Sequence, residues 1–234
     1  MKHLVFDTET TGLPIYPSGK KIRYISKHEL DYWPHIIQLS YIIYDDFERK
    51  ITKEVDEIIK IPENAEVSEE SFNLHGISKI TSLMKGKILD ITMNEFIKDC
   101  MTCDKIIGHN IRFDLDMIKV SLLRMNKVMN DFGFNNETDE YYNYICNQAK
   151  YKFHCTLMTN TERCNIIGKR PDGTDFVKWP KLSELYTNVF NESVPESKLH
   201  NAFIDVIVCL RCYLKIQYEC DVFNENVKIK NYVI

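Results

Sequence analysis

The strongest constraint on this chain is the stretch Leu-Val-Phe-Asp-Thr-Glu-Thr-Thr-Gly-Leu, which runs from Leu4 to Leu13. Its short apolar run predicts a buried strand, and Asp7 and Glu9, two residues apart, then point to the same face of that strand. Two carboxylates placed this way repel each other unless a cation lies between them. Because the ligands are oxygen atoms, a hard divalent ion such as Mg²⁺ or Mn²⁺ is favoured. The alternative is that Asp7 caps a turn and Glu9 is solvated.

Length and composition are those of one core-forming domain. The chain has 234 residues, of which 44% are hydrophobic, and we expect a single domain over residues 1–234. The net charge of −4 argues against a purely electrostatic nucleic-acid binder, but it allows an enzyme whose acidic centre is offset by bound metal. The N-terminus lacks a secretory signal pattern and no apolar run is long enough to span a bilayer, so we expect an intracellular, cytoplasmic protein without a membrane partner.

The eight cysteines are predicted to be reduced thiols. Two Cys-x-x-Cys pairs, Cys100/Cys103 and Cys209/Cys212, have the spacing of half a zinc site. Each pair falls in an apolar segment of helical periodicity rather than in a tight knuckle, and free cysteine is a common small core residue. Core packing is therefore predicted, with structural zinc as the alternative.

The periodicity of apolar residues predicts a mixed α/β sheet. The first strand and residues 36–44 and 51–61 are expected to form an antiparallel meander. Helices and short strands then alternate, with helix starts at Ser68 and Ser78, helices at 92–103, 111–125, 181–190 and 199–218, and strands at 105–108 and 153–157. Residues 14–34 and 165–178 are predicted to be loops, and 126–150 is predicted to be an elaborated connection that is irregular or in part helical. The tail 222–234 has no assignment from its pattern.

Four segments carry side chains suited to metal-assisted chemistry: Asp7 with Glu9, residues 108–114, residues 200–205 and, more weakly, residues 75–77. Asp114 could instead be a carboxylate favoured by the dipole at a helix N-terminus, and His200 could be a neutral cap. Asp205 lies among apolar residues, where a carboxylate needs a partner, and a cation is the simplest one. The four acidic positions in this order, with a histidine ahead of the last, favour a metal site over the separate alternatives.

These motifs resemble a known family. The D-x-E-T-T-G opening, the H-N-x-x-F-D segment at 109–114 and the H-x-A-x-x-D segment at 200–205 look like the DEDDh exonucleases, the DnaQ-like 3′–5′ group. Residues 33–40 and 179–186 are similar to blocks between the family motifs, so the resemblance covers most of the chain. It implies an RNase H-like α/β fold, a five-stranded mixed sheet flanked by helices on both sides.

The resemblance also implies a role for each matching residue. Two divalent ions, Mg²⁺ or Mn²⁺, would be held by Asp7, Glu9, Asp114 and Asp205, and His200 would be the general base for the attacking water. A sibling branch has Tyr four residues before the last Asp, where this chain has Asn201, so the His branch fits. Residues expected to contact the terminal nucleotide are Thr8, Thr10, Leu13, His75, Ile77, Asn110 and Phe113. Ordinary turn or core packing is their alternative.

Three functions are consistent with these features. The first is a metal-dependent 3′–5′ exonuclease that removes nucleoside 5′-monophosphates from single-stranded DNA ends by two-metal hydrolysis with a histidine base. The second is an RNA-trimming or oligoribonucleotide-degrading enzyme, distinguished by the 2′-OH of its substrate. The third is a non-catalytic nucleic-acid-binding or polymerase-associated module. The expected partner is a nucleic acid with a free 3′ end, and a separate polymerase is a further candidate.

Overall fold

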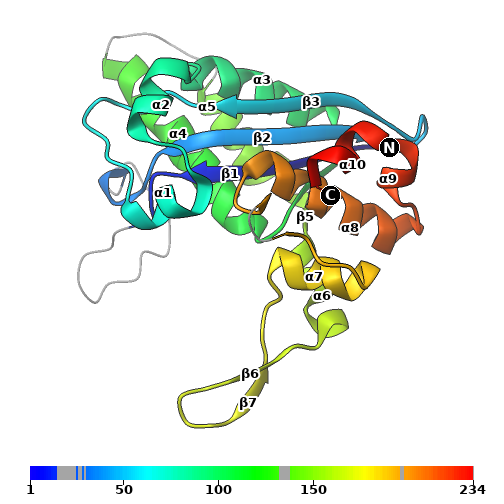
Figure 1. Cartoon of the computed structure of the whole chain (residues 1–234). Helices are drawn as coiled ribbons and strands as arrows, with labels where there is room; N and C mark the ends of the chain where they lie inside the picture. Colours follow the sequence, from blue (N-terminus) through cyan, green and yellow to red (C-terminus); the bar gives the residue numbers. More distant parts are fainter. Residues whose placement is uncertain (15–24, 26–27, 29, 132–137, 196–197, 234) are drawn as a thin grey trace.

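The computed structural model describes residues 1–14, 25, 28, 30–131, 138–195 and 198–233. Its centre is a five-stranded sheet in the order β3-β2-β1-β4-β5 (Figure 1). The strands are β1 (Lys2–Thr10), β2 (Ile36–Asp45), β3 (Lys50–Ile58), β4 (Lys105–Gly108) and β5 (Phe153–Cys155). β1 pairs antiparallel with β2 and β2 with β3, whereas β1, β4 and β5 run parallel to one another. The expected five-stranded mixed sheet is confirmed.

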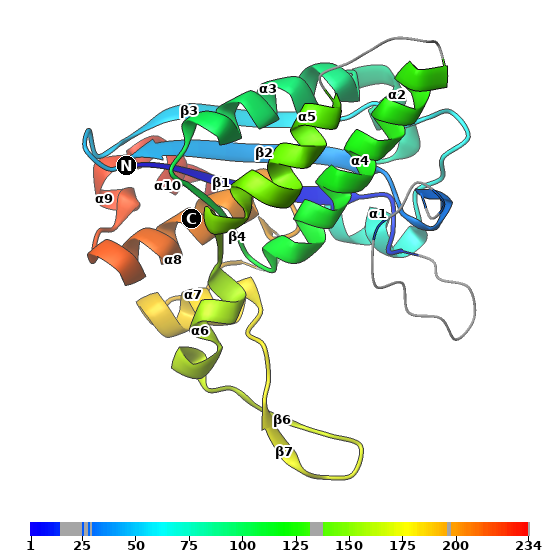
Figure 2. The ribbon, with the colours of Figure 1, turned by 180° about the vertical axis from the view of Figure 1, so that it is seen from behind.

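Helices cover both faces of this sheet (Figures 1 and 2). One face carries α3 (Leu89–Thr102), α4 (Ile111–Asp131) and α5 (Thr138–Asn143), and the other carries α7 (Leu182–Phe190) and α8 (Ala202–Tyr218). The remaining helical segments are the short turn η1 (Leu30–Tyr32), α1 (Glu69–His75), α2 (Lys79–Lys85), the π-helical turn η2 (Tyr144–Gln148), η3 (Ala149–Tyr151), α6 (Thr156–Cys164), α9 (Val222–Glu225) and α10 (Val227–Val233).

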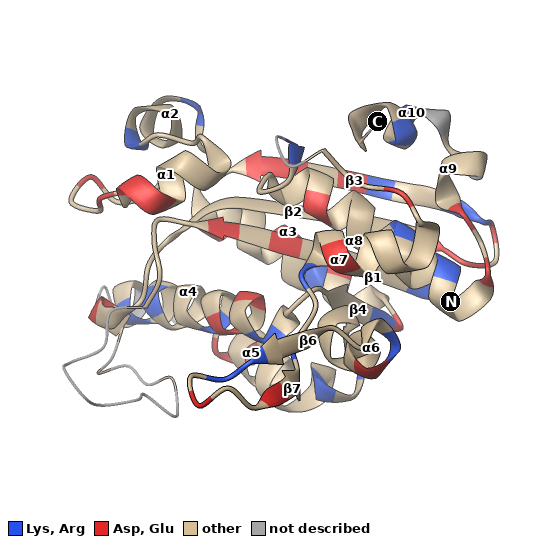
Figure 3. Ribbon diagram, turned by 60° about the horizontal axis from the view of Figure 1, so that its bottom comes forward, with Lys and Arg blue, Asp and Glu red and all other residues tan. Residues whose placement is uncertain are grey.

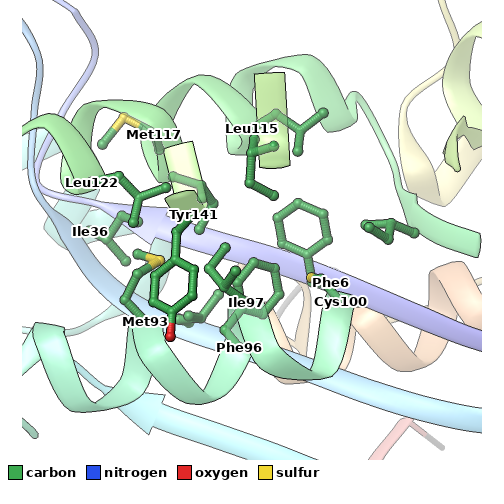
Figure 4. Packing of buried hydrophobic residues seen from close by; sticks show 14 of the residues in the cluster. Phe6, Ile36, Met93, Phe96, Ile97, Cys100, Leu115, Met117, Leu122 and Tyr141 are labelled. Carbon is green, nitrogen blue, oxygen red and sulfur yellow. The ribbon is translucent and has the colours of Figure 1, made fainter. Parts of the chain in front are cut away.

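The alternation of side chains along β1 divides the core into two layers. Leu4 and Phe6 belong to the cluster with α3 and α4, and Phe6 packs on Phe96 of α3 with the ring centroids 5.1 Å apart (Figure 4). Val5 belongs to the cluster with α7 and α8. Continued alternation therefore places Asp7 and Glu9 on the α8 side of the sheet. Thr8, which lies between these two residues, faces the α4 side of the sheet.

The last long helix begins at Ala202, not at Leu199 as predicted. Asn201 is its N-cap, because the side-chain oxygen accepts the N–H groups of Phe203 and Ile204 at 3.1 and 3.3 Å. His200, the residue before this cap, has a left-handed backbone with φ 64°, which a helix interior excludes. The Asn cap therefore starts the helix three residues later than its apolar periodicity indicates.

The connecting segments and the tail contain more regular structure than the sequence predicted. α4 continues to Asp131, and α5, η2 and η3 follow, so much of the connection 126–150 is helical. The expected loop 165–178 is the hairpin β6 (Ile167–Lys169) and β7 (Asp175–Val177), which projects from the body of the molecule (Figure 1). The tail forms α9 and α10 against α8, where Ile229 is buried. Within 14–34, residues 15–24, 26–27 and 29 lie outside the described residues.

Some boundaries also differ from the prediction. β3 ends at Ile58 instead of residue 61, α3 begins at Leu89 instead of residue 92, and β5 ends at Cys155, where α6 takes over. All eight cysteines are free, and the members of both Cys-x-x-Cys pairs are buried, as the core-packing prediction requires. Within the described ranges, no helix has the length and apolar character needed to cross a bilayer.

Candidate active site

Three carboxylates meet where the C-terminal end of β1 touches the N-terminal end of α8. Asp7 and Glu9 come from β1, and Asp205 comes from the first turn of α8. One ligand oxygen from each lies within 4.8 Å of the other two. The alternation along β1 and the cap at Asn201 together produce this arrangement, since both direct carboxylates to the same edge of the sheet.

A fourth carboxylate, Asp114, reaches the same edge from the other face. It lies in the first turn of α4, which follows β4, and β4 is the parallel neighbour of β1. Thr8 points to this side, and its N–H and hydroxyl donate to Asp114 Oδ1 at 3.2 and 2.7 Å. Asp114 is only 4% exposed. One carboxylate oxygen of Asp114 is therefore fixed by Thr8.

Burial raises the pKa of all four carboxyl groups, and repulsion from neighbouring carboxylates adds to this at Asp7, Glu9 and Asp114. Desolvation is the largest cause at each, and it raises the pKa of Asp7 well above its ordinary value, with further contributions from the charges of Asp114, Asp205 and Glu9. The pKa of Glu9 is raised to about 8 and those of Asp114 and Asp205 to about 7. An ionised cluster is thus unfavourable unless a cation compensates it.

The hydrogen bonds of Asp205 show that the cluster fits a cation. Its Oδ2 accepts the backbone N–H of His200 at 3.2 Å. Its Oδ1 is buried, and no group in the described part of the chain donates to it. A buried carboxylate oxygen without a donor is costly, and a metal ion would supply the missing partner. With Asp7, Glu9 and Asp114 nearby, the ligand set is all oxygen, which suits a hard divalent ion.

The raised pKa values predict how the stability of the metal-free protein depends on pH. The folded-state pKa values of Glu9, Asp114 and Asp205 lie above their ordinary values near 4, so the stability that these groups contribute is fully present below about pH 4. It is lost as the pH rises through about 7 to 8. We therefore expect the gain in melting temperature from Mn²⁺, relative to EDTA, to increase between pH 5 and pH 8. A gain that is constant or falls with pH would contradict the ionised cluster.

Two histidines near the cluster have different environments. His200 is exposed, next to Asp205. His75 is partly buried, and its Nδ1 accepts the N–H of Ile77 at 3.0 Å. Its Nε2 lies 3.2 Å from the carbonyl oxygen of Thr10, which can only accept, so His75 carries its proton on Nε2. Burial lowers the pKa of His75; the hydrogen bond to the Thr10 carbonyl opposes this effect, and the charge of the nearby His200 adds to it. His75 is thus committed to holding Thr10, whereas His200 is the candidate base.

A groove of about 850 Å³ opens beside the cluster. Glu9 lines it, as do five of the residues expected to contact a terminal nucleotide: Thr8, Thr10, Leu13, His75 and Phe113. The hydroxyl of Thr10 donates to the carbonyl of Gly12 at 2.7 Å, so it shapes the turn at the groove wall. Of the other two expected contacts, Ile77 packs in a small cluster with Ile37, Ile61 and Ala65, and Asn110 is exposed with φ 60° before α4.

Several residues of the site region were not identified from the sequence. Tyr32 and Leu74 line the groove, and Thr11 joins its walls, because the Thr11 N–H donates to the carbonyl of His35 and its own carbonyl accepts the N–H of Ser68. Tyr32 and Leu74 lie outside the motifs, and Thr11, although inside the D-x-E-T-T-G opening, acts through backbone hydrogen bonds that its sequence does not reveal. Gln38, discussed below, did leave a signal, a polar residue in an otherwise apolar strand.

Residues 4–213 match the family model for RNase T exonucleases. The chain belongs to this exonuclease family. The family is of the DEDDh, DnaQ-like type that the motifs predicted, so the predicted exonuclease family is confirmed. No curated protein sequence matches the chain.

Solved structures of exonuclease I share the RNase H-like fold of this chain. Escherichia coli exonuclease I in complex with a dT13 oligonucleotide has a TM-score of 0.61 and 14% identity, covering 93% of this chain and 42% of that chain. The zinc-bound E. coli ExoI–ssDNA complex has a TM-score of 0.59 and 17% identity, covering 96% of this chain and 42% of that chain. Exonuclease I from Methylocaldum szegediense has a TM-score of 0.58 and 14% identity, covering 96% of this chain and 42% of that chain. The chain spans less than half the length of these proteins, and the likeness establishes the fold.

Proposed function

We propose that this exonuclease is a divalent-metal-dependent 3′–5′ enzyme that removes nucleoside 5′-monophosphates from single-stranded DNA ends. The observation that carries the proposal is the convergence of Asp7, Glu9, Asp114 and Asp205 beside an exposed His200 and an open groove. The family match supports it, and the solved relatives include complexes with DNA oligonucleotides.

Hydrolysis of a phosphodiester needs an activated water and stabilisation of the charge that builds up at phosphorus. Divalent ions held by the four carboxylates, Mg²⁺ or Mn²⁺, would lower the pKa of bound water and stabilise that charge when present. His200 accepts the proton of the attacking water on its imidazole. Asp205 fixes the backbone at His200, and Thr8 fixes Asp114, so both faces of the site are held in place.

The groove favours a single-stranded end. Leu13 is 76% exposed at its wall, and Tyr32 and Phe113 add aromatic surface on which an unpaired base can stack whatever its identity. Basic and acidic residues are interspersed over the outer helices and the β6–β7 hairpin (Figure 3), and the net charge is −4. Recognition therefore rests on the terminal nucleotides in the groove more than on a long phosphate track.

A substrate panel tests this function. Oligonucleotides labelled at the 5′ end, single- and double-stranded, DNA and RNA, each with a free or blocked 3′ end, are incubated with Mg²⁺ or Mn²⁺ and with EDTA. We expect a ladder of shortened single-stranded DNA with release of mononucleotides, only with a free 3′ end and only with metal. Faster shortening of the matched RNA would instead assign the site to RNA trimming. Binding of ends without any product would indicate the non-catalytic module.

A further inference from the structure

A row of polar side chains crosses the sheet beside the carboxylate cluster, and metal binding does not account for it. In the antiparallel ladder, Ser40 of β2 lies opposite Asp7, and Gln38 lies opposite Glu9. Ser40 is 0% exposed and Gln38 is 3% exposed. Further along the same face, β2 presents Ile42 to the core of α8. Two polar residues buried at such positions need hydrogen-bond partners, and those partners indicate their role.

Both ends of the Gln38 amide are engaged. Its Nε2 donates to Asp56 Oδ1 on β3 at 2.7 Å, and its Oε1 accepts the backbone N–H of Ala202 at 3.3 Å. Ser40 Oγ donates to the same Asp56 oxygen at 2.7 Å. Because a carboxylate only accepts, Asp56 fixes the amide with its nitrogen toward β3 and its oxygen toward α8. The opposite orientation would place two donors, the amide and the Ala202 N–H, against each other.

The Ala202 N–H is one of the donors at the start of α8 that have no partner within the helix. The Asn201 side chain satisfies the next two donors, at Phe203 and Ile204, and Gln38 satisfies this first one. The same turn contains Asp205, whose Oδ2 accepts the N–H of His200. Gln38 of β2 thus holds the first residue of the helix turn that carries Asp205, and Asp205 in turn holds the backbone of His200.

We propose that Gln38, oriented by Asp56 and Ser40, is a positioning residue that sets the first turn of α8 and so places Asp205 and His200 against β1. The proposal rests on the exonuclease function above. Asp56 lies on β3, two strands away from β1, which is about 10 Å across the sheet. Asp56 therefore acts on the site only through Gln38 and Ser40.

Gln38→Leu keeps the approximate size of the side chain and removes both hydrogen bonds. We expect kcat to fall by about 10- to 100-fold, because a small displacement of positioned groups has effects of this size. KM should stay within about twofold, since Gln38 lies outside the groove. In the metal-free protein, the amide protons of His200 and Ala202 should exchange with solvent faster. Gln217→Leu, an exposed glutamine on the same helix, is the matched control and should change none of these quantities.

A second pair of variants changes Asp56, which orients Gln38 from a distance to the proposed metal site. This pair tests the proposal even if Gln38→Leu does not fold. Asp56→Asn keeps an acceptor oxygen for Gln38 and Ser40, so its kcat should stay within about threefold of wild type. Asp56→Leu removes the acceptor and should reproduce the lowered kcat and the faster exchange at Ala202. Equal activity of Asp56→Leu and wild type would overturn the proposal.

The remaining outcomes are also decisive. A lower melting temperature in Gln38→Leu, with unchanged kcat and unchanged exchange at His200 and Ala202, would mean that Gln38 is only a structural residue and would overturn the proposal. If the wild type cleaves no oligonucleotide, the proposed function fails. The positioning proposal is then judged on hydrogen exchange alone, where wild-type rates in both leucine variants would refute it.

Discussion

Asp7→Asn is expected to lower kcat by at least about 1000-fold, equivalent to about 4 kcal/mol of transition-state stabilisation, while raising the melting temperature of the metal-free protein. The two effects have one cause. Asp7 is the carboxyl on which burial and the charges of Asp114, Asp205 and Glu9 all act, so its neutralisation relieves repulsion in the absence of metal. The same change removes a charged ligand that both the metal and the reaction require.

The measurement pairs single-turnover cleavage of a labelled oligonucleotide with thermal unfolding in EDTA. Asp175→Asn is the matched control, because Asp175 is exposed on the β6–β7 hairpin, and it should change neither quantity. Similar rates for Asp7→Asn and wild type would refute the catalytic assignment. A lower melting temperature of Asp7→Asn in EDTA would refute the repulsion between carboxylates.

The second large effect is expected at the candidate base. His200→Asn should lower kcat by about 100- to 10,000-fold, the usual contribution of a general base, while the rise in melting temperature with Mn²⁺ is retained. Asn is chosen because His200 has φ 64°, a conformation that Asn tolerates better than Ala. The backbone N–H that donates to Asp205 is unaffected by the substitution, so the ligand stays in place.

Chemical rescue separates loss of the base from a local distortion at residue 200. Imidazole added to His200→Asn should restore part of the lost rate, whereas it should have no effect on Asp7→Asn. A wild-type rate in His200→Asn would show that the proton is taken by another group. Loss of the Mn²⁺-dependent rise in melting temperature would show that His200 supports the metal site instead.

Much of the site could be predicted because its chemistry is local in sequence. Asp7 and Glu9 are two residues apart on a strand, so their common face follows from strand geometry alone. Asp205 stands out as a carboxylate in an apolar helix. The convergence of Asp114 on the same edge is not a local property, because it depends on β4 running parallel to β1 and on Thr8 facing α4. The order of the four acidic motifs and the family resemblance predicted that Asp114 joins the site, but not the contacts that bring it there.

The features that escaped prediction depend on caps and on tertiary contacts. The start of α8 is set by Asn201, which interrupts a helical periodicity that extends to Leu199 when only apolar residues are counted. The hairpin 167–177 pairs Ile167 with Val177 across a turn at Gly173, and in a polar stretch this short the signal for a strand is weak. Gln38 was visible as a polar residue in an apolar strand, but its partner Ala202 is 164 positions away.

The most direct test of the central claim is a crystal soaked in Mn²⁺ and measured for anomalous scattering. We expect anomalous signal enclosed by the carboxylate oxygens of Asp7, Glu9, Asp114 and Asp205, with Asp205 Oδ1 turned to the ion as its missing partner. Carboxylates that point away from one another, with no anomalous signal between them, would contradict the account.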